Sequence, residues 1–168
     1  MVLVFVIASL VSLGFITVQA WNYNYYWTAH SQLTASLNRV HLDRDPATGN
    51  FIVQTSASVT NPTPYNGLTW FLAEVGIYFV NPTSNATIFS EAPILSSVNP
   101  MIAVRPGSTV TVTIPSPLSS TQSSTLLNQT GSIGTLHARV LLTVIVDSFL
   151  DPVIGRLQRM SLEEIPLS

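Results

Sequence analysis

The chain contains no cysteine and no lysine, and charged residues make up only 8% of its 168 residues. The absence of cysteine excludes disulfide bonds, thiolate metal ligands and a cysteine nucleophile. Six arginines carry all of the permanent positive charge on side chains, and the formal net charge is −2. Because so few cations cannot neutralise a run of phosphates, we expect no nucleic-acid partner.

The N-terminal segment MVLVFVIASLVSLGFITVQA has no ionisable side chain, and the first formally charged residue of the chain is Arg39. Twelve of these residues are Val, Leu, Ile or Phe. About 20 apolar residues in a helix reach ~30 Å, the thickness of the hydrocarbon core of a bilayer. Their insertion is favoured by about 4–7 kcal/mol, which exceeds the cost of the few Ser, Thr and Gln side chains. The segment therefore predicts a membrane-spanning helix.

Two features of this region predict what the helix contacts. Ala8 and Ser12 are small residues four positions apart, a spacing that allows close packing of helices, and Gly14 is a third small candidate. An aromatic cluster follows, where a membrane-interface belt would fall: Trp21, Tyr23, Tyr25, Tyr26 and Trp27. We therefore expect membrane lipid or neighbouring hydrophobic helices as partners, with a homo-oligomer or an envelope protein as further candidates.

Two interpretations of the N-terminal segment compete. A cleaved signal peptide is one, because Ala20 supplies the small residue that a cleavage site requires. A retained helix is the other, and we favour it because the basic region of a signal peptide is missing and the apolar stretch is longer than usual. We assign residues 1–30 to a membrane helix with its aromatic belt and residues 31–168 to a β-sandwich that lies outside the cell.

The rest of the chain has the pattern of short strands separated by turns. Strands are expected at 33–42, with Leu37 and His41 on one face, and at 51–60, 68–80, 109–114, 136–146 and 156–167. The third is apolar on both faces and should be central, with a bulge at Gly76. The polar segment 116–132 is expected to be a loop. With no amphipathic helix among the strands, the pattern predicts an antiparallel β-sandwich behind one hydrophobic helix.

The strand that ends at Asn61-Pro62, followed by Pro64-Tyr65, resembles the late-embryogenesis-abundant WHy domain (water stress and hypersensitive response). The resemblance extends over Leu33–Leu167 through the segments NGLTWFLAEVGIYFV, VRPGSTVTVTIPSPL and LHARVLLTVIV. It implies an immunoglobulin-like or fibronectin-like sandwich, often behind one membrane helix, with no known catalytic residues. The chain also resembles archaeal type IV pilins, which join a hydrophobic helix to a Ser/Thr-rich sandwich. That resemblance implies a filament subunit.

The candidate chemical groups favour a non-enzymatic protein. His41, Asp43 and Asp45 alternate as ligands on one strand face would, but the segment DRDPATGN that they enter is typical of a hairpin connection with solvated carboxylates. Glu163 and Glu164 point to opposite faces of an extended strand, which does not suit paired acid–base work. No Gly-x-Ser-x-Gly elbow and no glycine-rich phosphate loop occur. We expect no catalytic residue, no metal and no cofactor.

Two Asn-x-Thr sequons are candidates for glycosylation, at Asn85 and Asn128. Both fall in segments expected to be loops, and sugar would suit an uncharged surface exposed at a cell envelope.

The first functional hypothesis is a membrane-anchored structural or interaction module on the cell surface. The second is a subunit of a surface filament with its helix packed in the filament core. A small secreted binding protein and an enzyme follow.

Overall fold

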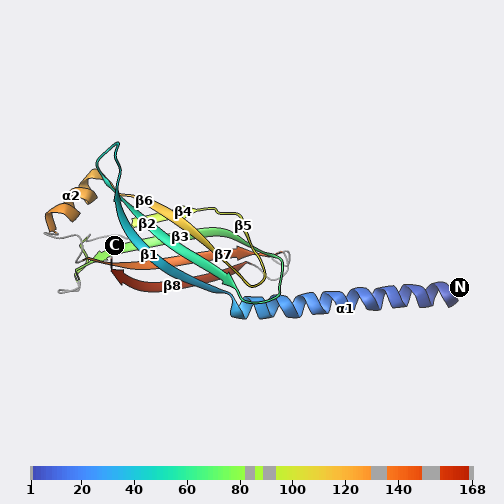
Figure 1. The fold of residues 1–168 in the computed structure, drawn as a ribbon. Coiled ribbons are helices and arrows are strands. Elements are labelled where there is room, and N and C mark those ends of the chain that lie inside the picture. The colour runs from blue at the N-terminus through green and yellow to red at the C-terminus, as the bar shows by residue number, and fades with distance from the viewer. Residues whose placement is uncertain (1, 82–85, 89–93, 130–135, 149–155, 167–168) are drawn as a thin grey trace.

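The computed structural model describes residues 2–81, 86–88, 94–129, 136–148 and 156–166. Helix α1 (Val2–Gln32) extends from one end of a β-sandwich as a single rod (Figure 1). Most of its length touches no other part of the described chain, and its last turns lie against the sandwich. The fold therefore confirms one hydrophobic helix followed by an antiparallel all-β domain.

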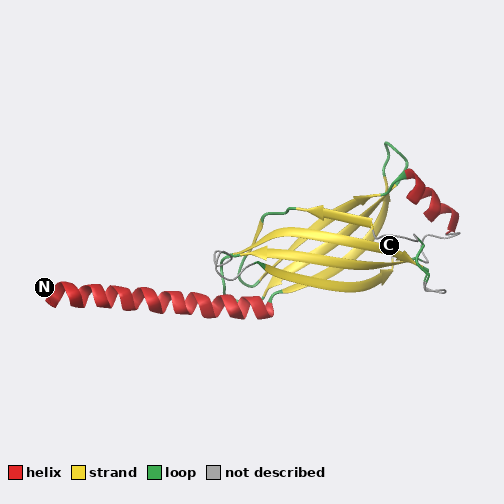
Figure 2. Ribbon diagram, turned by 180° about the vertical axis from the view of Figure 1, so that it is seen from behind, coloured by secondary structure: helices red, strands yellow, loops and turns green. Residues whose placement is uncertain are grey.

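The strands form two antiparallel sheets, seen from behind in Figure 2. Sheet A contains β1 (Thr34–Arg44), β2 (Phe51–Asn61) and β6 (Ser108–Pro117), in the order β1-β2-β6. Sheet B contains β4 (Ile94–Val98), β3 (Leu68–Val80), β7 (His137–Asp147) and β8 (Leu157–Pro166), in the order β4-β3-β7-β8. The short strand β5 (Ile102–Val104) pairs with the beginning of β3.

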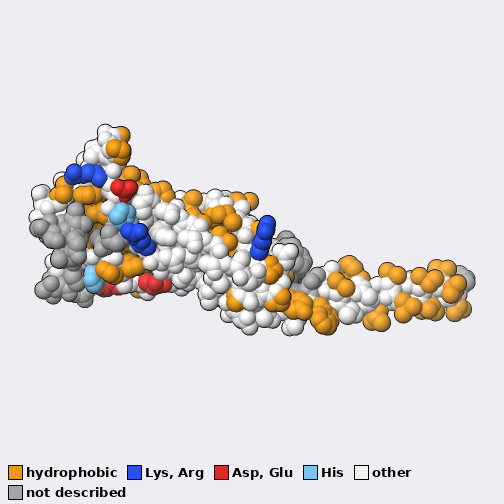
Figure 3. Space-filling model, viewed as in Figure 1, with side chains coloured by type: hydrophobic (Ala, Val, Ile, Leu, Met, Phe, Trp, Pro, Cys, Tyr) orange, Lys and Arg blue, Asp and Glu red, His pale blue; other side chains and the backbone are white. Residues whose placement is uncertain are grey.

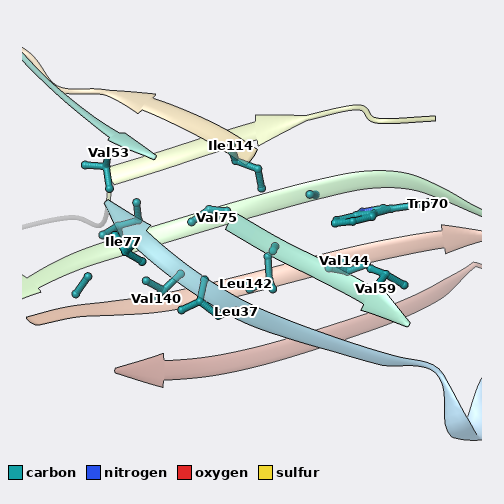
Figure 4. Close-up of a cluster of buried hydrophobic side chains, with 14 of the residues drawn as sticks. Leu37, Val53, Val59, Trp70, Val75, Ile77, Ile114, Val140, Leu142 and Val144 are labelled. Carbon is teal, nitrogen blue, oxygen red and sulfur yellow. The ribbon is translucent and has the colours of Figure 1, made fainter. Parts of the chain in front are cut away.

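The core lies between the two sheets and is made by alternating side chains of each strand (Figure 4). Strand β3 is central, as its two apolar faces predict, and its Trp70 and Ile77 are fully buried. The inward series of β7 is also as predicted, with Val140, Leu142 and Val144 in the core. Burying one such side chain contributes about 1.5–3 kcal/mol, so the alternating apolar residues of the strands contribute strongly to the stability of the fold.

Side chains bridge both seams between the sheets. At one seam, the Leu37 amide on β1 donates to Glu163 Oε1 on β8 at 3.5 Å. At the other, the Ser96 hydroxyl on β4 donates to the Pro115 carbonyl on β6 at 2.8 Å. Pro115 and Pro117 lie on β6, an edge strand of sheet A, where a missing N–H is tolerated. Glu163 and Glu164 point to opposite faces of β8, as predicted. Glu163 accepts from the Leu37 amide on β1, whereas Glu164 accepts from Arg139 on β7.

The outer face of sheet A carries paired hydroxyl groups across neighbouring strands. Thr60 and Thr109 share a hydrogen bond of 2.8 Å, and Ser58 and Thr111 share one of 2.9 Å. The Asn38 amide on β1 donates to the Ser58 hydroxyl as well. These pairs satisfy the polar groups of the face within the protein.

Three local predictions were wrong. Gly76 makes no bulge and pairs regularly with Leu95 and Leu141; the irregularity of β3 lies between Trp70 and Leu72. Strand β1 has its own irregularity between Leu37 and Arg39. An extra residue in a strand reverses the alternation of its side chains, so Val40 is buried and His41 leaves the face of Leu37.

The third error is the segment expected to be a loop, which contains helix α2 (Ser120–Gln129). Ser119 and Gln122 form a capping box: the Gln122 amide donates to Ser119 Oγ at 3.2 Å, and the Ser119 amide donates to Gln122 Oε1 at 2.9 Å. Leu126 is fully buried, and the Ser123 hydroxyl accepts from the Phe51 amide at 3.1 Å. The helix forms because these contacts anchor a sequence of low apolar content.

The loop after β2 is organised by the buried side chain of Asn61. Its Nδ2 group donates to the Tyr65 carbonyl at 2.8 Å and to the Val104 carbonyl at 3.3 Å. Its Oδ1 atom accepts from the amide and the hydroxyl of Thr63, at 3.1 Å and 2.7 Å. Pro62 and Pro64 are exposed in this loop. One amide thus fixes the loop and joins it to β5.

We expect Asn61→Ala to lower the free energy of unfolding by about 1–3 kcal/mol, because it leaves buried backbone carbonyls without a donor. The control is Asn66→Ala in the same loop, where the side chain is exposed and the change should cost less than about 0.5 kcal/mol. Chemical unfolding of both variants in the same detergent measures the difference. Equal free energies of unfolding for the two variants would show that the Asn61 hydrogen bonds do not stabilise the fold.

Candidate membrane anchor

Residues 2–20 of α1 form an apolar rod that is exposed on every side. Every Val, Leu, Ile and Phe from Val2 to Val18 is exposed, and Figure 3 shows hydrophobic side chains along this length. The helix has 31 residues, so it is about 46 Å long at about 1.5 Å per residue. By length and composition it can cross a membrane, and a signal sequence would meet the same criteria.

Two hydroxyl groups within the rod are satisfied by the helix itself. Ser9 Oγ donates to the Phe5 carbonyl at 2.9 Å, and Thr17 Oγ1 donates to the Leu13 carbonyl at 2.8 Å. A hydroxyl that bonds its own helix needs no water, so its cost in hydrocarbon is small. Ser9 and Thr17 therefore oppose insertion only weakly.

The three small residues proposed for helix packing do not share one face. Ala8 and Ser12 are about one turn apart and lie on the same side of α1, whereas Gly14 is about 200° round the helix from Ser12. All three are exposed, and a Cβ atom added at Gly14 would meet nothing within 4 Å. Ala8 and Ser12 can form one small-residue stripe, and Gly14 lies on another face. Helix packing at any of the three stays a prediction.

Four of the five aromatic residues form an exposed collar after the rod. Trp21 packs against Tyr25 with ring centroids 6.0 Å apart, and Tyr23 packs against Trp27 at 5.8 Å. These pairs are four residues apart and stack along the helix surface. We call these four residues the aromatic collar. Its amphipathic rings have the chemistry that favours the membrane–water interface.

Tyr26 corrects the prediction, because it is not part of the exposed belt. Its side chain is only 3% exposed and packs edge-on against Tyr65, with ring centroids 6.0 Å apart. Tyr65 lies in the loop after β2 that Asn61 organises. Ala29 and Leu33 are buried beside it on the same helical face. The sequence groups Tyr26 with its aromatic neighbours, but helical rotation turns it toward the sandwich.

Arg159 on β8 fastens the end of α1 to the sandwich. Its guanidinium donates to the carbonyl of His30 and, through Nε at 3.4 Å, to the carbonyl of Leu33. The last carbonyls of a helix have no hydrogen-bond partner within the helix. A cation beside them is also stabilised by the negative end of the helix dipole. No sequence signal pointed to Arg159, since it is 129 positions from His30. We call the contacts of Tyr26, Ala29, Leu33 and Arg159 the helix–sandwich junction.

The glycosylation candidates lie far from the anchor or outside the described residues. Asn128 is exposed in the last turn of α2, at the end of the sandwich opposite α1 (Figure 1). Asn85 lies outside the residues that the structure describes. Whether either carries sugar stays a prediction.

His41, Asp43 and Asp45, whose spacing was weighed as a metal-ligand pattern, lie in and beside a tight turn. Asp45 accepts from the Thr48 hydroxyl at 2.7 Å and from the Ala47 amide at 2.9 Å, and these bonds lower the pKa of its carboxyl. The sequence interpretation of this segment as a hairpin connection is confirmed. Among the residues that the structure describes, no group of three or more His, Asp or Glu side chains could hold a metal ion.

Comparisons with known proteins were made at three levels. No family model matches the chain, and no curated protein matches it in sequence. Solved structures that resemble it include a protein from Archaeoglobus fulgidus, with 15% identity, a TM-score of 0.49 and coverage of 77% of this chain and 94% of that one. Another is a protein from Arabidopsis thaliana, with 17% identity, a TM-score of 0.42 and coverage of 80% and 82%.

A putative late embryogenesis abundant protein also resembles the chain, with 13% identity and a TM-score of 0.42. The similarity covers 95% of this chain and 88% of that one. At these identities and scores the three similarities carry no functional argument.

We expect Arg159→Gln to loosen the helix–sandwich junction without unfolding the sandwich, since it removes the cation that caps α1. Losing charged hydrogen bonds to two carbonyls costs about 1.5–3 kcal/mol, which corresponds to about tenfold or more faster amide exchange at residues 29–33. Exchange within β3 and β7 should not change. Arg105→Gln, on an exposed turn, is the matched control. If both variants exchange alike at residues 29–33, Arg159 does not hold the junction.

Proposed function

We propose that the protein is a non-enzymatic, membrane-anchored module that holds its β-sandwich against the outer surface of the cell membrane. The observation that carries this proposal is the exposed apolar rod of α1, which is followed at once by the aromatic collar and the helix–sandwich junction. No water-soluble arrangement of the described residues covers this rod. A bilayer would bury it completely.

The lengths along α1 agree with this arrangement. Residues 2–20 give about 28 Å of helix, close to the ~30 Å of a hydrocarbon core. The aromatic collar at residues 21–27 then lies at the level of the lipid headgroups. The junction begins at Tyr26, so no flexible linker separates membrane and sandwich. The sandwich is held at a fixed height and angle.

The surface of the sandwich suits display outside the cell. It carries few charges and many Ser and Thr hydroxyls, and its sequon at Asn128 lies at the end away from α1. Several acid and base groups are occupied by structural contacts, as in the ion pairs of Glu164 with Arg139 and of Asp147 with Arg156. These features support a role in structure or interaction rather than catalysis.

The resemblance to the WHy domain supports the same proposal. Asn61 and Tyr65, which carry that resemblance, build the loop against which α1 packs. The motif therefore has a mechanical role here, since it joins the sandwich to the helix. This role needs no bound ligand.

We expect Leu10→Arg with Leu13→Arg to release the full-length protein from membranes, because each arginine near the bilayer centre costs about 2.5–3.5 kcal/mol. The control is Leu127→Arg with Leu162→Arg, two exposed positions on the sandwich, which should stay in the membrane fraction. Alkaline extraction followed by detection in pellet and supernatant measures this. A mass of the native protein that lacks residues 1–20 would overturn the anchor proposal directly.

A filament subunit is the second candidate, favoured by the Ala8 and Ser12 stripe on an otherwise bulky helix. A lone anchor exposes this stripe to lipid, whereas a bundle uses it for close backbone contact. Under the anchor proposal, Ala8→Leu with Ser12→Leu leaves the protein inserted and extractable by mild detergent as the same small species as the wild type. A wild type that resists detergent as a large assembly, which the double variant dissolves, would instead establish the bundle. Size-exclusion chromatography with light scattering distinguishes the two results.

A further inference from the structure

The outer face of sheet B has an apolar row that crosses four strands. Register places Leu95 of β4, Gly76 of β3, Leu141 of β7 and Leu162 of β8 side by side. Leu95 is 77% exposed and Leu162 is 64% exposed. Because Gly76 has no side chain, the row is interrupted in the middle of the sheet, between two leucines whose backbones are about 10 Å apart.

This interruption is a hollow of about 310 Å³, which we call the Gly76 notch. Gly76 forms its floor, and Leu95 and Leu141 form two of its walls. Tyr78 lies on one side of Gly76 along β3, and Glu74 lies on the other, flanked by Ser97 and Thr143 in the neighbouring strands. The notch therefore combines apolar walls, one aromatic ring, two hydroxyls and one carboxylate.

Glu74 differs from the other acidic side chains that the structure describes. The other carboxylates each accept a hydrogen bond or form an ion pair: Asp43, Asp45, Asp147, Glu163 and Glu164. Glu74 has no such contact within the described chain. It is exposed on a central strand, between Ser97 and Thr143 and beside the apolar walls of the notch. In a chain with eight acidic residues, an unpaired carboxylate at a concave apolar site favours a cationic occupant from outside.

We propose that the Gly76 notch docks an arginine side chain presented by an extended segment of a partner protein. The guanidinium donates to the Glu74 carboxylate as a planar fork, and its aliphatic stem covers Leu95 and Leu141. The ring of Tyr78 offers a face for the cation. Arginine fits this set better than lysine, whose compact ammonium is more strongly hydrated and does not stack.

The apolar surface beyond the notch favours a protein segment over a small free cation. Met160 and Leu162 on β8 are each 64% exposed and extend the apolar surface past β7. A small amine would fill the notch and leave this surface in water, whereas an extended segment would cover it. The proposal goes beyond the membrane anchor and does not depend on α1, so either can fail alone.

The test uses the full-length protein in detergent micelles and two short peptides. One is acetyl-Gly-Val-Arg-Val-Gly-amide, and the other has neutral citrulline in place of arginine. Binding is followed by the NMR amide signals of Gly76 and Thr143. We expect the arginine peptide to bind at least about fivefold more tightly than the citrulline peptide, as a single ion pair at a partly exposed site allows. Added salt should reduce this difference.

Two matched variants decide which carboxylate is responsible. Glu74→Gln should remove the preference for arginine, whereas Glu164→Gln on the same face should keep it, because Glu164 is already paired with Arg139. Equal affinity of both peptides for the wild type, or an unchanged preference in Glu74→Gln, would overturn the proposal. Butylguanidinium bound as tightly as the arginine peptide would also overturn it, in favour of a site for small cations.

Discussion

The side-chain amide of Asn61 is the interaction on which the arrangement of helix and sandwich depends. It ends β2, fixes the following loop and reaches the backbone of Val104 in β5, so it links both sheets at the end nearest α1. The same loop presents Tyr65 to Tyr26 of α1. Because Asn61 is fully buried, every one of its polar atoms must be paired, and its position allows little freedom. One small polar group thus fixes the loop against which a long helix packs.

A second contact holds the end of α1 and comes from the C-terminal part of the described chain. Arg159 lies in the last strand of the described chain and holds the end of the first helix. The helix end is therefore supported by a loop of early sequence and by a strand of late sequence. Such non-local support makes the junction a product of the folded sandwich, since its contacts join segments that are far apart in the sequence.

The sequence predicts the sandwich and the rod well because both depend on local patterns. Alternation in β6 and β7 places Ile114, Val140 and Val144 in the core, as expected. The pattern cannot predict where an extra residue reverses the alternation of side chains along a strand. The irregularity between Leu37 and Arg39 adds one residue to β1 and turns His41 away from the expected face.

The errors at other sites have different causes. Helix α2 was missed because Ser and Thr dominate its sequence, although Ser119 and Gln122 have the spacing of a capping box. That signal was present and could have been used. Tyr26 and Arg159 belong to the junction, where burial depends on contacts between distant segments. No local pattern of residues encodes such contacts, so the junction could be identified only from the fold.

The paired hydroxyls on sheet A have a consequence for the environments that the protein can tolerate. The rows Thr34, Thr60 and Thr109, and Ser36, Ser58 and Thr111, contain no group that gains or loses a proton near neutral pH. They lie toward the end of the sandwich from which α1 extends. Acid therefore finds no group to titrate on these two rows, and added salt finds no charge of theirs to screen.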